Sequence, residues 1–332
     1  MGQIKRLIVA GFAVLVAIQH ARSEGVRKVD AAPNRTQQME AERLITYLNT
    51  VGRTPLSEAC KTLLRPVFVQ ASAGILSPSA STPEVKNCLG GEYGYITPIR
   101  QPLPSQSVSF ERSNGVTRIT ISRFTDTTAE EFRQIVKGMK EKYIVFDLLN
   151  NPGGVTLAAY GILMNFPCVH NGPMITFTGR LPDVWEIKRG PLVEELRSTR
   201  VVVLVGKRTA SASEVLALGL KYCNPLSVVI VGEKTVGKHE WQLVEKIGSV
   251  HVRVVVGSWF IGGGKDRCPI SRCSVESGGI EPDISMAPSV EGAVRLASRW
   301  RAIVESTTTQ APPSTDVNPG GNATHISPSP QQ

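Results

Sequence analysis

Three short segments of the chain contain residue types that acyl-transfer chemistry uses, and each segment directly follows an apolar run. The first is Asn150–Gly154, after the run that ends at Leu149. Its paired glycines, Gly153 and Gly154, let backbone amides approach a substrate closely and adopt unusual dihedral angles. The segment is therefore a candidate oxyanion-hole loop, although Asn, Pro and Gly are also ordinary turn residues and a plain turn explains them on their own.

The second segment is Thr209–Glu214, in which Ser211 stands at the start of a predicted helix. A hydroxyl at that place lies beside free backbone amides, which can stabilise the oxyanion formed when the hydroxyl attacks a carbonyl. Ser211 and Glu214 also have the three-residue spacing of a helix-capping box. Taken alone, capping explains the pair as well as catalysis does.

The third segment is Gly232–Lys238, with Gln242 four residues further on. A lysine can activate a serine only where burial and neighbouring groups lower its pKa toward neutrality. Most lysines in loops are solvated charges instead. The glycines on either side of Lys234–Val236 indicate a tightly shaped loop, which favours a specific role for Lys238.

The elements around these segments alternate between strand and helix. Continuous apolar runs predict buried strands, and the intervening segments have the pattern of helices, giving strands at 143–149, 201–205 and 228–231 and helices at 155–166 and 211–222. This order predicts a parallel sheet with right-handed crossovers. Because the carboxyl ends of parallel strands converge, we expect a nucleophile, a base and oxyanion donors to meet at one edge of the sheet.

The remaining patterns predict the rest of the fold more coarsely. We expect a helical stretch at 40–66, loops at 70–107, a hairpin around Gly115, a helix from a capping box at 127–130 to about 140, a hairpin around Gly248 and a closing helix at 291–303.

Four motifs together resemble the carboxyl-terminal processing, or tail-specific, serine protease family. They are Tyr143–Gly154, Thr209–Glu214, Gly232–Gln242 and Gly279–Asp283, and the likeness extends over about residues 116–290 in the order of the family. The resemblance implies an α/β fold similar to crotonase and ClpP, with a parallel-sheet protease core and a small helical N-terminal part. It also implies a serine/lysine mechanism that uses no metal and no cofactor.

The resemblance also implies individual site residues. The nucleophile would be Ser211, the general base Lys238, and Gln242 would help to orient the lysine. The backbone amides of Ala212 and of Gly153 or Gly154 would form the oxyanion hole.

The chain departs from the family pattern at several places. Leu149 stands where the strand motif usually has an arginine, His239 follows the lysine in place of a glycine, and the serine and lysine are slightly further apart than usual. Only a short stretch separates Gly94 from the hairpin around Gly115. The family's peptide-binding PDZ domain would not fit there, so we expect substrate recruitment to differ.

Three other interpretations compete with a serine/lysine protease. A histidine base would have to be His170, His239 or His251, and the chain has no GxSxG nucleophile motif. A catalytically silent peptide-binding module on the same fold would explain the altered motifs, but not the presence of Ser211, Lys238 and Gln242 together. An acyl-thioester enzyme would share the oxyanion hole and gives no reason for the serine and lysine.

The N-terminus resembles an export signal. Two basic residues precede the apolar run 7–18, and small residues follow at 21–23. We therefore expect a signal peptide at 1–23 and a periplasmic or secreted protein. The alternative is an uncleaved membrane anchor, for which the run is short.

The cysteine count fits an exported chain. The six cysteines are an even number, and local pairing would join Cys60 to Cys88, Cys168 to Cys223 and Cys268 to Cys273. A zinc site is the weaker alternative, because no two cysteines have CxxC spacing.

Composition limits the partners. The chain has 332 residues and a formal net charge of +9, but its basic residues are scattered. No basic stripe points to nucleic acid, and we expect protein or peptide substrates and no stable membrane insertion after signal cleavage. The expected organisation is a signal peptide at 1–23, a helical and loop region at 24–107, a tail-specific protease domain at 108–304 and a disordered tail at 305–332.

Overall fold

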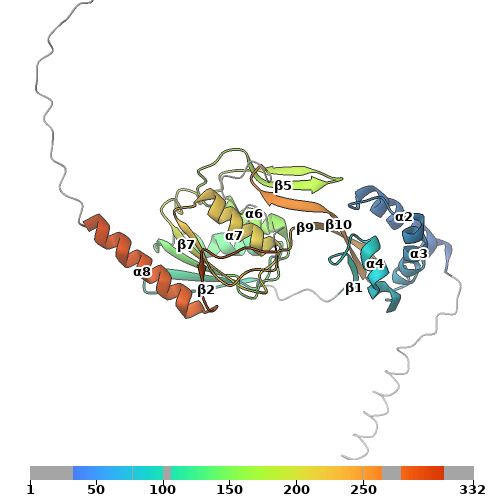
Figure 1. The fold of residues 1–332 in the computed structure, drawn as a ribbon, viewed down its shortest axis with the longest axis horizontal. Helices are drawn as coiled ribbons and strands as arrows, with labels where there is room; N and C mark the ends of the chain where they lie inside the picture. The colour runs from blue at the N-terminus through green and yellow to red at the C-terminus, as the bar shows by residue number, and fades with distance from the viewer. Residues whose placement is uncertain (1–32, 77, 100–105, 249, 264–277, 310–332) are drawn as a thin grey trace, which may run out of the picture. The chain divides into compact units, whose positions relative to one another are not determined.

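A computed structural model describes residues 33–76, 78–99, 106–248, 250–263 and 278–309, with the backbone alone for 301–309. The predicted signal peptide and the Cys268–Cys273 pair lie outside these residues. The chain divides into two compact units, which are drawn in Figure 1. The first contains 1–101, 178–182 and 240–258, and the second contains 102–177, 183–239 and 259–332. No helix in the described ranges is both long and apolar enough to cross a membrane.

Two helices form the core of the first unit, where the sequence predicts one helical stretch. Helix α2 (Arg35–Val51) begins at the cap Asn34, and helix α3 (Glu58–Ser72) begins at Ser57, whose hydroxyl accepts a bond of 3.1 Å from the amide of Cys60. The helices are separate because Gly52 ends α2. Their apolar faces pack together with the hairpin of β9 (Glu240–Ile247) and β10 (Val250–Ile261).

The region 70–107, predicted as loops, contains regular elements in its described part. These are η1 (Pro78–Ser81), α4 (Pro83–Cys88) and β1 (Tyr95–Pro98). Thr82 caps α4, since its hydroxyl accepts a bond of 3.4 Å from the amide of Val85. Strand β1 pairs antiparallel with β10. The prediction of loops is therefore wrong for these residues.

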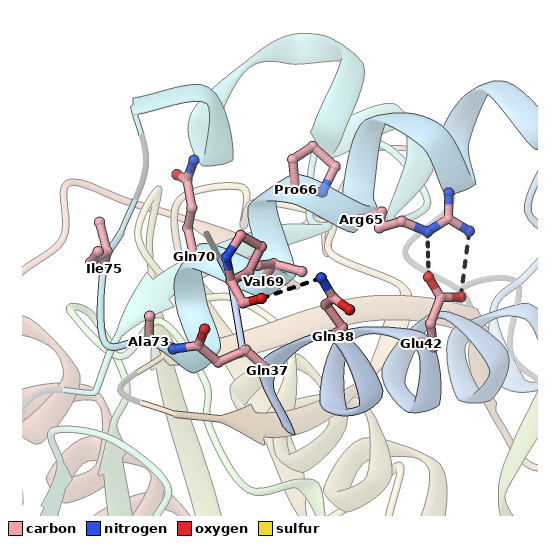
Figure 2. Close-up of a pocket in the computed structure, with 10 residues that line it drawn as sticks. Gln37, Gln38, Glu42, Arg65, Pro66, Val69, Gln70, Ala73 and Ile75 are labelled. Atoms are coloured by element: carbon pink, nitrogen blue, oxygen red, sulfur yellow. Dashed lines mark hydrogen bonds and ion pairs between the residues drawn. The ribbon is translucent and has the colours of Figure 1, made fainter. Parts of the chain in front are cut away.

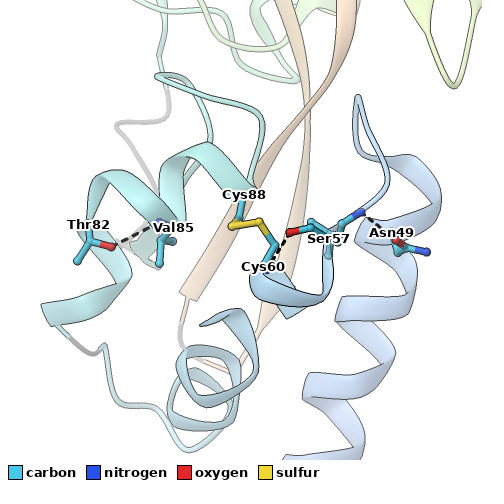
Figure 3. The surroundings of a disulfide bond; sticks show 7 residues. Asn49, Ser57, Cys60, Thr82, Val85 and Cys88 are labelled. Atoms are coloured by element: carbon cyan, nitrogen blue, oxygen red, sulfur yellow. Dashed lines mark hydrogen bonds between the residues drawn. A yellow bond between two sulfur atoms is a disulfide. The ribbon is translucent and has the colours of Figure 1, made fainter. Parts of the chain in front are cut away.

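Two of the three predicted disulfides are present. Cys60–Cys88 joins the first turn of α3 to the end of α4 (Figure 3), and Cys168–Cys223 lies in the second unit. No free cysteine occurs among the residues that the structure describes. Local pairing is thus confirmed for these four cysteines.

Removing the Cys60–Cys88 disulfide should destabilise the first unit. The crosslink spans a sequence separation of 28 residues, and releasing a loop of that length restores entropy to the unfolded chain worth about 3.5 kcal/mol. We expect the Cys60→Ser/Cys88→Ser variant to lose about that free energy of unfolding in a urea titration. Thiol counting with and without reductant is the control for the intended loss. An unchanged unfolding midpoint would contradict the prediction.

A six-stranded sheet organises the second unit. Its order is β11-β8-β7-β4-β3-β2, and β2 (Val108–Ser113) and β3 (Val116–Ile121) form the predicted antiparallel hairpin. The other strands run parallel to β3: β4 (Tyr143–Asp147), β7 (Arg200–Val205), β8 (Val228–Gly232) and β11 (Ile284–Ser285). The turn of the hairpin uses positive φ at Asn114 and Gly115 (50° and 72°), as two-residue hairpin turns do.

Helices pack on both faces of this sheet because its central strands, such as β4 and β7, are buried on both sides. On one face Phe146 of β4 contacts Phe132 of α5 (Thr128–Val136), with ring centroids 5.8 Å apart. Helix α5 contacts α6 (Thr156–Leu163), and α6 contacts α7 (Ala212–Cys223). On the other face α8 (Val290–Thr309) covers Tyr143 and Val145. The predicted mixed α/β fold with a parallel sheet is confirmed.

Helix ends and one hairpin differ from expectation. Helix α5 stops at Val136, before Gly138, and its cap residue Thr127 makes no side-chain capping bond. The Thr127 hydroxyl donates to Glu131 instead. Helix α8 continues to Thr309, beyond its predicted end. Strands β5 (Pro173–Gly179) and β6 (Asp183–Glu186), which the sequence patterns do not predict, form an antiparallel pair.

Candidate active site

Three loops meet at the carboxyl edge of the parallel strands. They follow β4, β7 and β8, which are consecutive neighbours in the sheet, and they contain Asn150–Gly154, Gly206–Ser211 and Glu233–Lys238. Adjacent parallel strands deliver their following loops to the same edge. The convergence expected from the sequence therefore exists in the fold.

Thr209 ties all three loops together. Its buried hydroxyl donates to the carbonyl of Leu148 at 2.8 Å and accepts the amide of Gly206 at 2.9 Å. Its carbonyl accepts the amide of Val236 in the lysine loop at 3.0 Å. Because these bonds are buried and paired, they hold the loops in register.

Ser211 occupies a strained backbone position. Its dihedral angles are φ 57° and ψ −120°, and the amide of Ser213 bonds to the carbonyl of Ala210 at 3.2 Å. This is a type II′ turn with Ser211 at the first central position, where glycine is normally preferred. A non-glycine residue there costs about 1–3 kcal/mol. The turn places the half-buried Ser211 at the first turn of α7.

Glu214 joins the serine to the lysine loop. Its side chain is fully buried, and its Oε2 accepts both the amide of Ser211 at 2.7 Å and the amide of Lys238 at 3.0 Å. The other oxygen accepts the amide of Gly237 at 2.7 Å and the hydroxyl of Thr235. Ser211 and Lys238 thus share one carboxylate oxygen through their backbones. Capping of α7 accounts for only one of these four bonds.

Burial raises the pKa of the Glu214 carboxyl, and the bonds from Thr235 and the three amides oppose that rise. All four contacts come from donors, so the arrangement suits the ionised carboxylate. The sequence analysis treats Glu214 only as a capping residue. Its position in the otherwise apolar stretch 214–220 is the signal that could have indicated a buried role.

The glycine loop lies directly against the serine. Gly153 and Gly154 have φ of 98° and 140°, and a Cβ on Gly153 would lie 2.8 Å from the Cβ of Ser211 and 3.1 Å from the amide nitrogen of Ala212. Only glycine allows this approach. The Gly153 amide donates to the side chain of Asn151 at 2.9 Å. Among the described residues, no hydrogen bond leaves the amide of Gly154 or of Ala212.

The backbone of Lys238 is held on both sides. Its amide donates to Glu214, and its carbonyl accepts the indole nitrogen of Trp259 at 3.2 Å. Gly237 before it has φ of 89° and packs against the backbone of Gly279, which begins the last of the four predicted motifs. The lysine loop is therefore closely shaped, as its glycines predict.

Comparison with known proteins identifies the family to which these loops belong. The sequence model of peptidase family S41 matches residues 115–286. The chain belongs to peptidase family S41. The resemblance to carboxyl-terminal processing proteases is confirmed at this level.

Two curated relatives of this S41 chain carry more specific names. It is 27% identical over 194 residues to a probable CtpA-like serine protease from Staphylococcus epidermidis, covering 57% of this chain and 37% of the relative. It is 30% identical over 174 residues to the carboxy-terminal processing protease CtpA of Bacillus subtilis, covering 50% and 36% respectively. The matched part is little more than a third of either relative.

A solved structure described as a lipoprotein from Streptococcus agalactiae is similar in fold to the S41 chain. The TM-score is 0.59 at 16% identity, and the match covers 82% of this chain and 99% of the other. At that identity the likeness concerns the fold alone.

The remaining predicted site residue of the S41 chain, Gln242, lies in β9 of the first unit. It pairs with Val255 in the neighbouring strand, and its side-chain amide donates to the carbonyl of Tyr93. Its predicted role in orienting the lysine stays a prediction.

The three histidines considered as alternative bases lie in different parts of the fold. His239 lies within the lysine loop, where its Nδ1 is 3.4 Å from the carbonyl oxygen of Gly237. His170 stacks on the ring of Tyr222 at 4.3 Å, and His251 lies in β10 opposite Lys246. Of the three, His239 alone belongs to one of the three strand-end loops.

Leu149, at the position where the family motif usually has an arginine, makes apolar contacts. Its side chain joins the cluster between the sheet and α8 and lies over Gly206. The Asp147 carboxylate accepts the amide of Leu149 at 3.2 Å, a local bond that acids beside turns commonly form. The S41 chain thus fills this position with a hydrophobic contact in place of a charge.

The described residues hold no candidate metal centre, and a groove in the first unit is lined by none of the site residues. No group of three metal-ligating side chains occurs among the described residues. A groove of about 750 Å³ lies between α2 and α3 (Figure 2), with the Arg65–Glu42 ion pair at its side and residues of both helices along it. It contains none of the predicted site residues.

Replacing Glu214 by glutamine should impair catalysis strongly. The new NH2 group would take the place of an oxygen that accepts two donors, and each unsatisfied buried donor costs about 1–3 kcal/mol. We expect kcat for peptide hydrolysis to fall by about 10²-fold, since 1.4 kcal/mol corresponds to a factor of ten.

Glu194→Gln is the matched control, because Glu194 is exposed and pairs with the surface residues Arg189 and Arg197. Stability gives a second measurement. A raised folded pKa means that Glu214 lowers the free energy of unfolding as pH rises through that pKa, and the glutamine variant should lack this contribution. Wild-type kcat in a folded Glu214→Gln protein would contradict the prediction.

Proposed function

We propose that this S41 peptidase is an exported serine endopeptidase that cleaves proteins or peptides through Ser211 and Lys238 and processes their carboxyl-terminal regions. The observation that carries the proposal is the single Glu214 oxygen that binds the backbone amides of both residues. It brings a strained, helix-start serine and the lysine loop to one point.

The proposed reaction begins with neutral Lys238. Its amine accepts the proton of the Ser211 hydroxyl while Oγ attacks the scissile carbonyl carbon, and the electron pair of the carbonyl moves to its oxygen. The amides of Ala212 and the glycine loop stabilise that oxyanion. When the intermediate collapses, the carbon–nitrogen bond breaks and the leaving amine takes the proton from Lys238.

The second half of the reaction releases the acyl group. Water attacks the ester on Ser211, and Lys238 accepts a proton from that water. Collapse of the second intermediate breaks the ester bond and returns the proton to Oγ. The products are the free acid and the original enzyme.

Export is supported by two kinds of observation. The sequence predicts a signal peptide at 1–23, and four cysteines form the two disulfides described above. Disulfides persist mainly in oxidising compartments.

A fluorophosphonate probe tests the proposal directly. A serine nucleophile forms an oxygen–phosphorus bond and displaces fluoride, so mass mapping should place one label on Ser211. Carboxyl-terminal processing is tested by mapping the cleavage sites in an unstructured protein substrate. A wild-type protein that neither takes the label nor hydrolyses peptide would instead indicate a silent peptide-binding module.

A further inference from the structure

The buried side chain of Asn151 links the glycine loop to its surroundings. Asn151 has no exposed surface, and its Nδ2 donates to the carbonyl of Ile121 at the end of β3 at 2.9 Å. Its Oδ1 accepts the amide of Gly153 at 2.9 Å. One carboxamide therefore fixes the position of the loop against a neighbouring strand.

The backbone of the same residue holds the serine turn. The Asn151 carbonyl accepts the amide of Ala210 at 3.2 Å and the hydroxyl of Ser213 at 3.1 Å. These two residues are the first and last of the turn that presents Ser211. Asn151 thus contacts both the nucleophile turn and the loop of oxyanion donors.

These bonds distinguish between the two glycine amides. The Gly153 amide is already bound to Asn151, and the Gly153 carbonyl accepts the amide of Phe124 at 3.0 Å. The amides of Gly154 and Ala212 donate no hydrogen bond within the described residues. Because Asn151 is enclosed on all sides, its carboxamide has no solvent to turn toward and keeps Gly153 engaged.

We propose that Asn151 is a positioning residue for the oxyanion hole: it holds the Gly153 amide so that Gly154 and Ala212 supply the two donors. This inference rests on the proposed serine peptidase function. Asn151 acts through the loop and the turn and does not itself touch the reacting carbonyl.

The test is Asn151→Ala in the full chain, assayed with a peptide substrate and with a peptidyl aldehyde. The aldehyde forms a hemiacetal with Ser211, and its carbonyl oxygen then occupies the oxyanion site. Displacing a donor should lower kcat by about 10²-fold, as loss of one oxyanion donor does, and weaken aldehyde binding by a similar factor. KM should stay near the wild-type value, because the ground-state carbonyl uses these donors less.

Asn165→Ala is the matched control. Asn165 is also buried, and its side chain also bridges backbone groups, bonding to Gly161 at 2.8 Å and Leu192 at 3.4 Å. Its loss should leave kcat and aldehyde affinity close to wild type. An equal fall in both variants would show a purely structural effect and overturn the proposal, as would unchanged kcat in folded Asn151→Ala.

Asn151→Asp is a second variant in case the alanine variant does not fold. It keeps an acceptor for the Gly153 amide and loses the donor to Ile121. If the alanine variant folds, Asn151→Asp should retain more activity than that variant. If the alanine variant does not fold, Asn151→Asp should still hydrolyse peptide, with a reduced kcat and a KM near the wild-type value. If neither variant folds, Asn151 is a structural requirement and the positioning role is wrong. Failure of the proposed function has a different signature, since wild type would then show no hydrolysis and no fluorophosphonate label.

Discussion

Ser211→Ala should abolish peptide hydrolysis while leaving the fold intact. The hydroxyl is the proposed nucleophile, and loss of one member of a coupled catalytic set lowers kcat by roughly 10⁴-fold or more. The Ser211 amide still binds Glu214 in the variant, because that bond comes from the backbone. Thermal unfolding should therefore change little, and steady-state hydrolysis of a fluorogenic peptide measures the loss.

Ser213→Ala is the control for this variant. Ser213 is the second serine of the same motif, and its buried hydroxyl donates to the carbonyl of Asn151 at 3.1 Å. Because that bond helps to hold the serine turn, Ser213→Ala should lose stability and some activity, but far less activity than Ser211→Ala. Substantial hydrolysis by folded Ser211→Ala would falsify the serine assignment.

Lys238→Met should cause a loss of comparable size. Methionine keeps an unbranched apolar stem and removes the amine that takes the serine proton. The bonds of residue 238 to Glu214 and Trp259 survive, because both involve the backbone. We expect kcat to fall by roughly 10⁴-fold, with fluorophosphonate labelling of Ser211 slowed in parallel.

Lys234→Met is the matched control from the same loop. Lys234 is half-exposed and pairs with Glu281 at 2.7 Å, so it should be dispensable for chemistry. If Lys238→Met remained active, His239 would be the next candidate base. The double variant Lys238→Met/His239→Ala separates the two, because the residual activity would vanish in it if His239 were the base.

The core of the second unit follows closely from the sequence. Uninterrupted apolar runs such as Val201–Val205 predict strands buried on both faces, and the alternation with helices predicts their parallel order. The turn at Asn114–Gly115 is equally clear, because a two-residue hairpin turn needs positive φ. Local chemistry and tertiary structure agree in these places.

The first unit follows less well from local patterns. Its Ser-, Pro- and Gly-rich stretch looks like loop, yet Thr82 and Pro83 begin a short helix that the Cys60–Cys88 bond holds in place. Strand β1 depends on pairing with β10, more than 150 positions further along the chain. Such long-range partners leave no local periodicity.

Some features of the candidate site could likewise be predicted from the sequence, and others could not. The glycines and the helix-start serine carry their own signals, so their convergence could be predicted. The bonds of Asn151, Thr209 and Glu214 could not, because each depends on a partner from another loop. Buried polar residues of this kind become informative only once the fold places their partners.

The backbone conformation at Ser211 affects which residue evolution would favour there if catalytic activity were lost. Glycine would adopt φ 57° without the steric penalty that serine meets there. A lineage that had lost the need for a hydroxyl would find Ser211→Gly stabilising and reachable by one substitution. The turn therefore penalises the side chain that it presents, and selection for stability alone would favour glycine at this position once cleavage no longer mattered to the organism.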